Sequence, residues 1–219
     1  MTRPVRPRRA ASLILLRPGE SGPEALLGRR SRTARFMPGY YVFPGGAVQR
    51  SDTTPWRAEG PPAADIRDNK LRALARAALR ETFEETGFIL GRPAAAPADR
   101  PIAGLSDIER AYLDSQHVPA IDALMPIGRA ITPTRSPIRY DAQFFLADGR
   151  LAIGPFQAGD ELDEIGWYGV GGGAPTPMSG VTQFMLQHAL SVWNGSAASS
   201  APLYRHIGNR PKIEWRMSG

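Results

Sequence analysis

Residues Arg80-Glu81-Thr82-Phe83-Glu84-Glu85-Thr86-Gly87-Phe88 carry the most informative pattern of the chain, and they end a segment, 69–86, with helical periodicity. At about 100° per residue, Glu81, Glu84 and Glu85 fall on one face of the predicted helix, within an arc of roughly 100°. Gly87 is placed to cap its carboxyl end. Apolar side chains occupy the adjacent arc and are expected to face the core: Leu71, Leu74, Ala75, Ala78, Leu79 and Phe83.

Three glutamates crowd into the last turn and a half of this helix. The helix dipole makes that end negative, so each carboxylate there is unfavourable by about 0.3–1 kcal/mol before mutual repulsion. Hard oxygen ligands clustered beside a core are what Mg²⁺ or Mn²⁺ require, although most acidic helix faces are only solvated surface. Arg80 lies one turn before Glu84 and is close enough to pair with its carboxylate. The helix alone leaves both a metal site and a solvated face open.

Segments on both sides of the helix alternate between strand and helix patterns. Predicted strands span 10–16, 24–29, 40–43, 124–132, 138–147 and 165–168, and further helices span 105–116 and 181–193. This alternation predicts an α/β sandwich, in a single domain over 1–219. Three segments are expected outside the regular core: a basic arm at 1–9, an insertion at 47–68, and a linker and tail at 194–219.

The composition limits the classes of partner and compartment. The 219 residues are 42% hydrophobic and 22% charged, as in an ordinary globular protein. There is no cysteine for disulfides or zinc, and no apolar run approaches the ~20 residues that cross a bilayer. We therefore expect a cytoplasmic protein without a membrane partner. The net charge is +6, but the arginine clusters at 3–9 and 29–35 lack interleaved aromatics, so nucleic acid is not expected as the primary partner.

The pattern Arg-Glu-apolar-x-Glu-Glu-x-Gly-apolar over 80–88, preceded by the Gly45-Gly46 turn, resembles the Nudix box. Every fixed position of the C-terminal half of the box is matched, with Thr82 replacing an aliphatic residue. The resemblance implies a Nudix α/β/α sandwich with a mixed sheet. It also implies a metal-dependent hydrolase that cuts the diphosphate of a small nucleoside-diphosphate-linked substrate. The implied functional residues are Glu81, Glu84, Glu85 and the backbone carbonyl of Gly46 for Mg²⁺ or Mn²⁺, and Glu84, Arg80 and Glu81 for catalysis.

One position departs from the box. The usual box has a further glutamate eight residues before its arginine, where this chain has Arg72. The spacing between the Gly-Gly turn and the helix arginine is also longer, because residues 47–70 intervene. Asp52 or Asp68 is a candidate replacement for the missing acid, which leaves the number of metals open.

The segment before the box, 26–46, resembles the coenzyme A-linked signature of Nudix diphosphatases. It has Leu-Leu-x-x-Arg-Ser, then Arg, Gly and Phe-Pro-Gly-Gly at the spacing of the signature, with Gly28 in place of a threonine. The long insertion and Ile131-Thr132-Pro133 add a resemblance to the peroxisomal-type acyl-CoA diphosphatase branch, over residues 10–190. The implied substrate-binding residues are Arg29, Arg30, Arg35 and Phe43.

Coenzyme A gives these arginines a physical role. It carries a 3′-phosphate besides its diphosphate, and guanidinium forks grip phosphates bidentately. Arg29, Arg30, Arg32 and Arg35 would then hold the anionic nucleotide end. The expected products are adenosine 3′,5′-bisphosphate and phosphopantetheine or its acyl ester. A soluble arginine-rich loop is the simpler alternative.

Several assignments stay open at this point. The substrate is alternatively ADP-ribose or a dinucleotide, or the protein is a non-catalytic nucleotide-binding regulator. The general base is a Nudix glutamate or part of the acidic loop 160–164, where Glu161 is the best match and a solvated turn is the alternative. Histidines at 117, 188 and 206 lack zinc spacing. The tail after Asn194 is a candidate for exchange between the subunits of a homodimer.

Overall fold

A computed structural model describes residues 5–57, 59, 68–95, 104–155, 161–196, 200–208 and 210–217. Strand β1 (Arg8–Gly19) forms its centre, because the apolar run of this strand is buried on both faces. Leu13 and Leu15 point into one core, and Ile14 and Leu16 point into another. This two-residue alternation is that of an extended strand. β1 therefore lies between two layers and has no solvent face.

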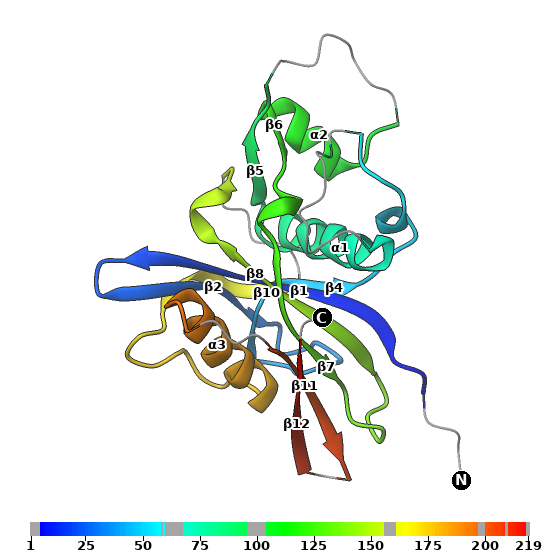
Figure 1. Ribbon diagram of the computed structural model, residues 1–219, viewed down its shortest axis with the longest axis vertical. Helices are drawn as coiled ribbons and strands as arrows, with labels where there is room; N and C mark the ends of the chain where they lie inside the picture. Colours follow the sequence, from blue (N-terminus) through cyan, green and yellow to red (C-terminus); the bar gives the residue numbers. More distant parts are fainter. Residues whose placement is uncertain are drawn as a thin grey trace.

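β1 belongs to a mixed sheet that has nine strands in the described part of the chain (Figure 1). Its other strands are β2 (Gly22–Arg30), β3 (Tyr41–Val42), β4 (Gly45–Ala47), β7 (Met125–Ile131), β8 (Tyr140–Asp148), β10 (Leu162–Gly169), β11 (Ser200–Ile207) and β12 (Arg210–Met217). The order along the sheet is β10-β2-β1-β8-β7-β11-β12, with β3 paired to β2 and β4 to β1. β8 is parallel to β1 and β11 is parallel to β7, whereas the remaining pairs are antiparallel.

One helix covers each face of this sheet. Helix α1 (Asn69–Thr86) lies on one face and helix α3 (Gly180–Trp193) on the other (Figure 1). Leu79 of α1 shares a core with Leu13, and Met185 of α3 shares the second core with Ile14. The predicted α/β/α sandwich with a mixed sheet is confirmed. Within the described residues, no helix is both long and apolar enough to span a membrane.

Helix α1 has the predicted bounds because both of its ends are capped. The side chain of Asp68 accepts a hydrogen bond from the N–H of Lys70 at 3.0 Å. Gly87 adopts φ 76°, and its N–H donates to the oxygen of Phe83 at 2.8 Å. The acidic residues are thus held in the last turns of a helix with defined ends.

A smaller sheet lies beyond α1 and was not predicted. Its three strands in the described residues are β5 (Ile89–Pro93), β6 (His117–Pro119) and β9 (Ala152–Ile153), in the order β6-β5-β9. Helix α2 (Asp107–Asp114) lies beside it, within the predicted helix 105–116. Tyr112 of α2 is buried, and its hydroxyl donates to the oxygen of Leu90 at 2.8 Å. These strands have five residues or fewer, which is too short for a periodic pattern.

In the described part of the chain, single turns of 3-10 helix connect the larger elements: η1 (Ser51–Thr53), η3 (Ile121–Ala123) and η4 (Gly149–Leu151). η1 opens the 47–68 insertion and buries Asp52. Trp56 follows, and its ring centroid lies 6.1 Å from that of Tyr112. The insertion therefore packs against α1 and α2 where it is described, whereas 58 and 60–67, and residues 1–4 of the basic arm, lie outside the described residues.

The segment 194–219, expected as a linker and tail, instead contains the β11–β12 hairpin. β11 extends the main sheet by pairing with β7 at Leu203 and Tyr204, and both side chains are buried. The Ser- and Ala-rich run before it has no strand periodicity, which is why the composition indicated a linker. The burial of β11 comes from a strand more than 70 residues earlier in the chain.

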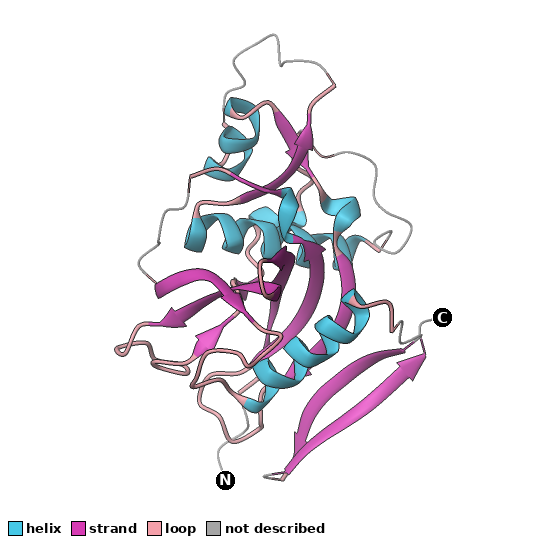
Figure 2. Cartoon of the chain, turned by 90° about the vertical axis from the view of Figure 1, so that its left-hand side faces the viewer, coloured by secondary structure: helices cyan, strands magenta, loops and turns pink. Residues whose placement is uncertain are grey.

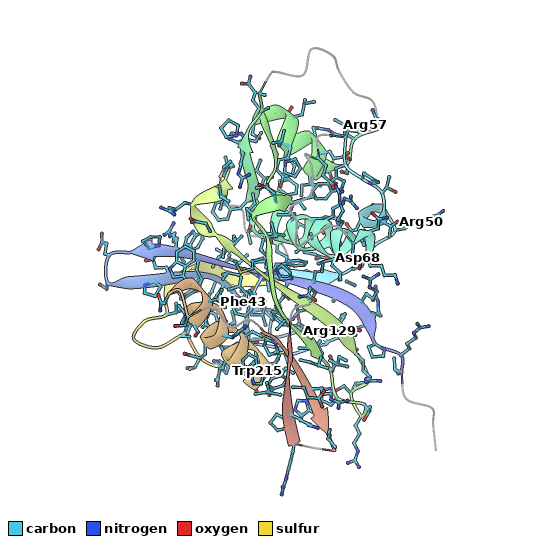
Figure 3. All side chains as sticks on the ribbon, in the orientation of Figure 1. Phe43, Arg50, Arg57, Asp68, Arg129 and Trp215 are labelled. Atoms are coloured by element: carbon cyan, nitrogen blue, oxygen red, sulfur yellow. The ribbon has the colours of Figure 1, made fainter. Side chains whose placement is uncertain are left out.

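The hairpin also packs on α3. The ring of Trp215 lies 6.3 Å from the ring of Phe184 and 5.4 Å from the ring of His188. Figure 2 shows the hairpin alongside α3, and Figure 3 shows Trp215 between the two. Trp215 still has 53% of its surface exposed. His188 is therefore part of an aromatic contact between α3 and the hairpin.

Candidate active site

The Gly45-Gly46 turn lies directly against the acidic face of α1. The N–H of Gly45 donates to Oε2 of Glu85 at 2.9 Å. A Cβ on Gly45 would lie 2.4 Å from the backbone oxygen of Ala11, and one on Gly46 would lie 2.5 Å from the carboxylate of Glu81. Glycine is needed at both positions, because the chain passes between β1 and α1 without room for a side chain.

Glu81 and Glu85 hold two carboxylates in a poorly hydrated place. Glu85 is 3% exposed, and its burial raises its pKa to about 8. The negative charges of Glu81 and Glu161 also raise the pKa of Glu85, whereas Arg30 lowers it. Burial raises the pKa of Glu81 as well. Buried carboxylates with a further acid nearby are stabilised by a cation.

Arg80 holds the acidic face together. Its Nη1 donates to Oε1 of Glu81 at 2.9 Å and to Oε2 of Glu84 at 2.8 Å. Its Nε and Nη2 donate to the two carboxylate oxygens of Asp52 at 2.9 and 3.0 Å, and Nη2 also donates to the oxygen of Ala47 at 3.1 Å. These contacts use the five N–H groups of the guanidinium. Arg80 therefore orients glutamates and has no donor left for a substrate.

Of the two acids that could replace the glutamate missing from the box, Asp52 binds Arg80 and Asp68 does not. Asp52 is 0% exposed, and it also accepts from the N–H of Gln49 at 2.7 Å. Asp68 is exposed and caps the start of α1, away from the glutamates, as Figure 3 shows. The acid from the start of the insertion thus binds the arginine of the box.

Arg72, at the position where the box has its further glutamate, is neutralised by Glu59 of the insertion. Glu59 pairs with Arg72 and accepts from Nε and Nη2 of Arg76 at 2.6 and 2.8 Å. The side chains of Glu59 and Arg76 are almost fully buried. This contact was not predicted, because Glu59 lies in a segment of the sequence without periodicity. Arg76 could have indicated the contact, because it lies four residues before Arg80 on the buried side of the helix. A buried cation there needs an acidic partner.

Of the two arginines of β2, Arg30 acts on a glutamate of α1, whereas Arg29 lies on the other face of the strand. Arg29 pairs with Glu164, which also accepts from the hydroxyl of Tyr41 at 2.8 Å. Arg30 is half-buried, and its charge acts on Glu85. The Nε atoms of Arg29 and Arg30 are buried without a hydrogen-bond partner among the described residues. An anion that reached such a donor would form a charge-assisted hydrogen bond with it.

The other two predicted substrate-binding residues lie apart from this group. Arg35 is exposed. Phe43 is buried in the core, where its ring packs edge-on against Phe144 at 6.4 Å (Figure 3). The structure therefore brings Arg30 to the acidic face, pairs Arg29 with Glu164 on the other face of β2, and places Phe43 inside the protein. The role of each in binding stays a prediction.

The acidic face has the donors for a hard divalent cation but is not arranged around one. Among the described residues, no three His, Cys, Asp or Glu side chains form a ready-made metal site. Glu81 and Glu84 are turned to Arg80, and Glu85 is turned to the N–H of Gly45. The chemistry still fits, because carboxylate oxygens next to a backbone carbonyl are the ligands that Mg²⁺ and Mn²⁺ take.

No family model matches the sequence. The fold, however, matches the crystal structure of a Nudix hydrolase from Alicyclobacillus acidocaldarius, with 32% sequence identity and a TM-score of 0.60. The match covers 88% of this chain and 85% of that chain. The chain belongs to the Nudix hydrolases. It is therefore an enzyme that hydrolyses the diphosphate of a nucleoside-diphosphate-linked substrate.

A more distant match shows the same fold. The NUDIX domain of Shewanella oneidensis NrtR, solved in complex with ADP ribose, is 11% identical, with a TM-score of 0.50. The match covers 86% of this Nudix hydrolase and 90% of that chain.

The acidic loop of this Nudix hydrolase divides between two sites. Asp160 lies outside the described residues. Glu161 is exposed, and its charge acts on both Glu81 and Glu85. Glu164 is bound by Arg29 and Tyr41. Glu161 therefore belongs to the acidic face, which sequence reasoning had left open.

A cleft of about 1080 Å³ opens beside Glu84. Its walls come from the C-terminal half of α1, from α2 and from the β9 segment. Glu81, Glu85 and Arg30 are not among its lining residues. The cleft therefore borders Glu84 but does not include Arg30.

Proposed function

We propose that this Nudix hydrolase cleaves the diphosphate of coenzyme A or an acyl-CoA with Mg²⁺ or Mn²⁺, releasing adenosine 3′,5′-bisphosphate and phosphopantetheine or its acyl ester. One observation carries the proposal: the half-buried guanidinium of Arg30 acts on Glu85, and its Nε has no partner among the described residues. A phosphate bound there lies next to the buried glutamates. The signature that contains Arg30 supports the same substrate.

The proposed metal ligands are Glu81, Glu84, Glu85 and the backbone carbonyl of Gly46. A bound divalent metal neutralises the diphosphate oxygens and lowers the pKa of water. Arg80 orients Glu81 and Glu84 through one nitrogen, and Asp52 fixes the plane of the guanidinium. Each carboxylate therefore approaches the reacting diphosphate from a defined direction.

Glu161 is the proposed general base. It is exposed and close enough to Glu81 and Glu85 to act on both charges, which puts it on the solvent side of the cluster. There it accepts a proton from the water that attacks one phosphorus. The bond from that phosphorus to the bridging oxygen breaks, and the leaving phosphate takes the electron pair.

ADP-ribose is the second candidate substrate. The NrtR domain with the same fold binds ADP ribose. ADP-ribose lacks the 3′-phosphate of coenzyme A, so it offers one anionic group fewer to the arginines of β2.

We further propose a homodimer that forms through β12. This strand ends the sheet of the described residues and has an unpaired edge. An antiparallel pair of two copies centred on Ile213 would place Lys212 opposite Glu214 of the second copy, and Pro211 opposite Trp215. Because the pairing is symmetric, the Lys212–Glu214 pair and the Pro211–Trp215 pair each form twice. A cytoplasmic location stays a prediction.

The test of the catalytic proposal is a product analysis. The purified protein is incubated with Mg²⁺ or Mn²⁺ and with CoA, acyl-CoAs, ADP-ribose or NADH, and the products are identified by mass. We expect adenosine 3′,5′-bisphosphate from CoA or its esters, and no product with EDTA. Glu84→Gln and Glu85→Gln are expected to abolish turnover, whereas Glu20→Gln, at an exposed turn, serves as the matched control. Cleavage of ADP-ribose or NADH alone would favour the second candidate, and cleavage of none of these compounds would contradict the proposed substrate.

A further inference from the structure

We propose that the cleft beside Glu84 binds the uncharged tail of the substrate, the pantetheine arm and its acyl chain. This inference rests on the proposed function, and it adds where each half of the substrate lies. The nucleotide half lies at the β2 arginines, the diphosphate at the glutamates, and the tail between α1 and α2.

The cleft joins the proposed reaction site, and part of its wall is apolar. Its apolar lining residues come from α1, β5, α2 and β9: Phe83, Ile89, Ile108, Ala111 and Ile153. Phe83 precedes Glu84 in α1 and is only partly buried. One turn of helix thus supplies both a reacting carboxylate and a wall of the cleft, so a tail attached to the diphosphate can enter the cleft directly.

The charges of the cleft disfavour a phosphate. Glu84, Asp107 and Asp114 are exposed acids among its lining residues. Arg80 is the one basic residue in the described lining, and its donors are taken by Asp52, Glu81, Glu84 and Ala47. An anionic nucleotide end would meet repulsion there without a free cation. A neutral tail is not repelled by these acids and needs no cation.

The size of the cleft also indicates more than a diphosphate. Its volume of about 1080 Å³ is slightly above the ~300–1,000 Å³ typical of clefts that enclose drug-sized ligands. Half of its lining residues are polar or charged, and uncharged ones such as Gln49, Ser51 and Ser106 suit the amides of a pantetheine arm. The acyl chain would then follow toward Ile108 and Ile153.

The test narrows the cleft from α2. Ala111→Phe places a ring in the cleft, and Ala111→Val narrows it less. Leu113→Phe adds the same ring to the same helix outside the lining residues, as the matched control. Thermal melting shows that each variant folds. We expect Ala111→Phe to lower kcat/KM for octanoyl-CoA at least tenfold more than for CoA, with Ala111→Val intermediate and Leu113→Phe like the wild type.

A binding measurement separates this inference from the proposed function. Octanoyl-pantetheine, which has no phosphate, is titrated into the wild type and the Ala111 variants by calorimetry. Binding that Ala111→Phe weakens at least tenfold supports the cleft, even if no CoA ester is cleaved and the proposed function has failed. Equal kcat/KM losses for both substrates, or octanoyl-pantetheine binding that neither Ala111 variant changes, would overturn the inference while leaving CoA cleavage intact.

Discussion

Two arginines beside the acidic face of α1 differ in how their donors are used, and this difference assigns their roles. The guanidinium of Arg80 is fully engaged with Asp52, two glutamates and a backbone oxygen, so it positions other groups. Arg30 keeps a buried Nε without a partner among the described residues. A donor in that state gains a charge-assisted hydrogen bond when a phosphate reaches it. We therefore expect a substitution of Arg30 to change substrate binding.

Replacing Arg30 by alanine is expected to weaken substrate binding more than it affects folding. A charge-assisted hydrogen bond contributes about 1.5–3 kcal/mol, so KM for CoA should rise about tenfold or more. Steady-state kinetics on CoA measure the change. Arg57→Ala, at an exposed position of the insertion, is the matched control. An unchanged KM for CoA in Arg30→Ala would contradict the role of Arg30 in binding.

Gly46→Ala is expected to lower metal-dependent activity while the protein stays folded. The added Cβ would lie 2.5 Å from the carboxylate of Glu81, which must move away. A misplacement of about 1 Å at a reacting group costs about 10²-fold in rate. Gly172→Ala is the control, because a Cβ there meets no atom within 4 Å. Rates at saturating Mg²⁺ measure the activity, and melting temperatures measure the stability. An unchanged rate would show that Glu81 can move without a loss of activity.

At the level of elements, the insertion is joined to α1 by buried charges. Glu59 holds Arg72 and Arg76, and Asp52 holds Arg80. The three arginines are four residues apart, so they lie on one side of α1, about one helical turn from each other. The insertion therefore stabilises the helix that carries the glutamates, although it lies far from them in sequence.

Glu59→Gln is expected to destabilise the protein by about 3–5 kcal/mol, because it leaves the buried charge of Arg76 without its partner. Urea denaturation measures the free energy of unfolding, and Glu20→Gln is the control at an exposed position. A loss below 1 kcal/mol would mean that solvent reaches Arg76 in the folded protein.

The same ion pair predicts an acid-labile component of stability. Burial raises the pKa of Glu59, but hydrogen bonds from Arg76 and Arg72 outweigh it and hold that pKa below its usual 4.5. A depressed carboxyl pKa contributes stability that is present above pH 4.5 and is lost as the pH falls through the folded value. The difference in unfolding free energy between the wild type and Glu59→Gln should therefore shrink below pH 4.5. Urea titrations at pH 7 and at pH 3.5 test this, and a constant difference would contradict it.

For the whole molecule, the free edge of β12 predicts the oligomeric state. Light scattering of the wild type is expected to give twice the 23.8 kDa chain mass, and Ile213→Asp should give the monomer, because two aspartates would face each other at the dimer axis. Val5→Asp changes another exposed apolar residue and should leave the dimer intact. A monomeric wild type would overturn the β12 interface.

Local periodicity was enough for the helix 69–86, for its Gly87 cap and for the central strand at 10–16. Each of these elements is long and has one or two buried faces, so the pattern of apolar residues repeats several times. The β5-β6-β9 sheet and the β11–β12 hairpin escaped prediction. Their strands are short, or follow a low-complexity run, and are buried by pairing with distant segments.

The box residues themselves identified the acidic face, because Glu81, Glu84 and Glu85 are close in sequence and a helix turns them to one side. Which distant groups meet that face was settled by the tertiary structure. Asp52 reaches Arg80 across 28 positions, Glu164 takes Arg29, and Arg30 keeps its unpartnered donor. Helical spacing acts over a few residues, whereas ion pairs between segments depend on how strands and insertion pack together. For that reason the sequence alone determined the helix and its row of glutamates, and the packing of the chain determined which arginines are paired with acids from other segments.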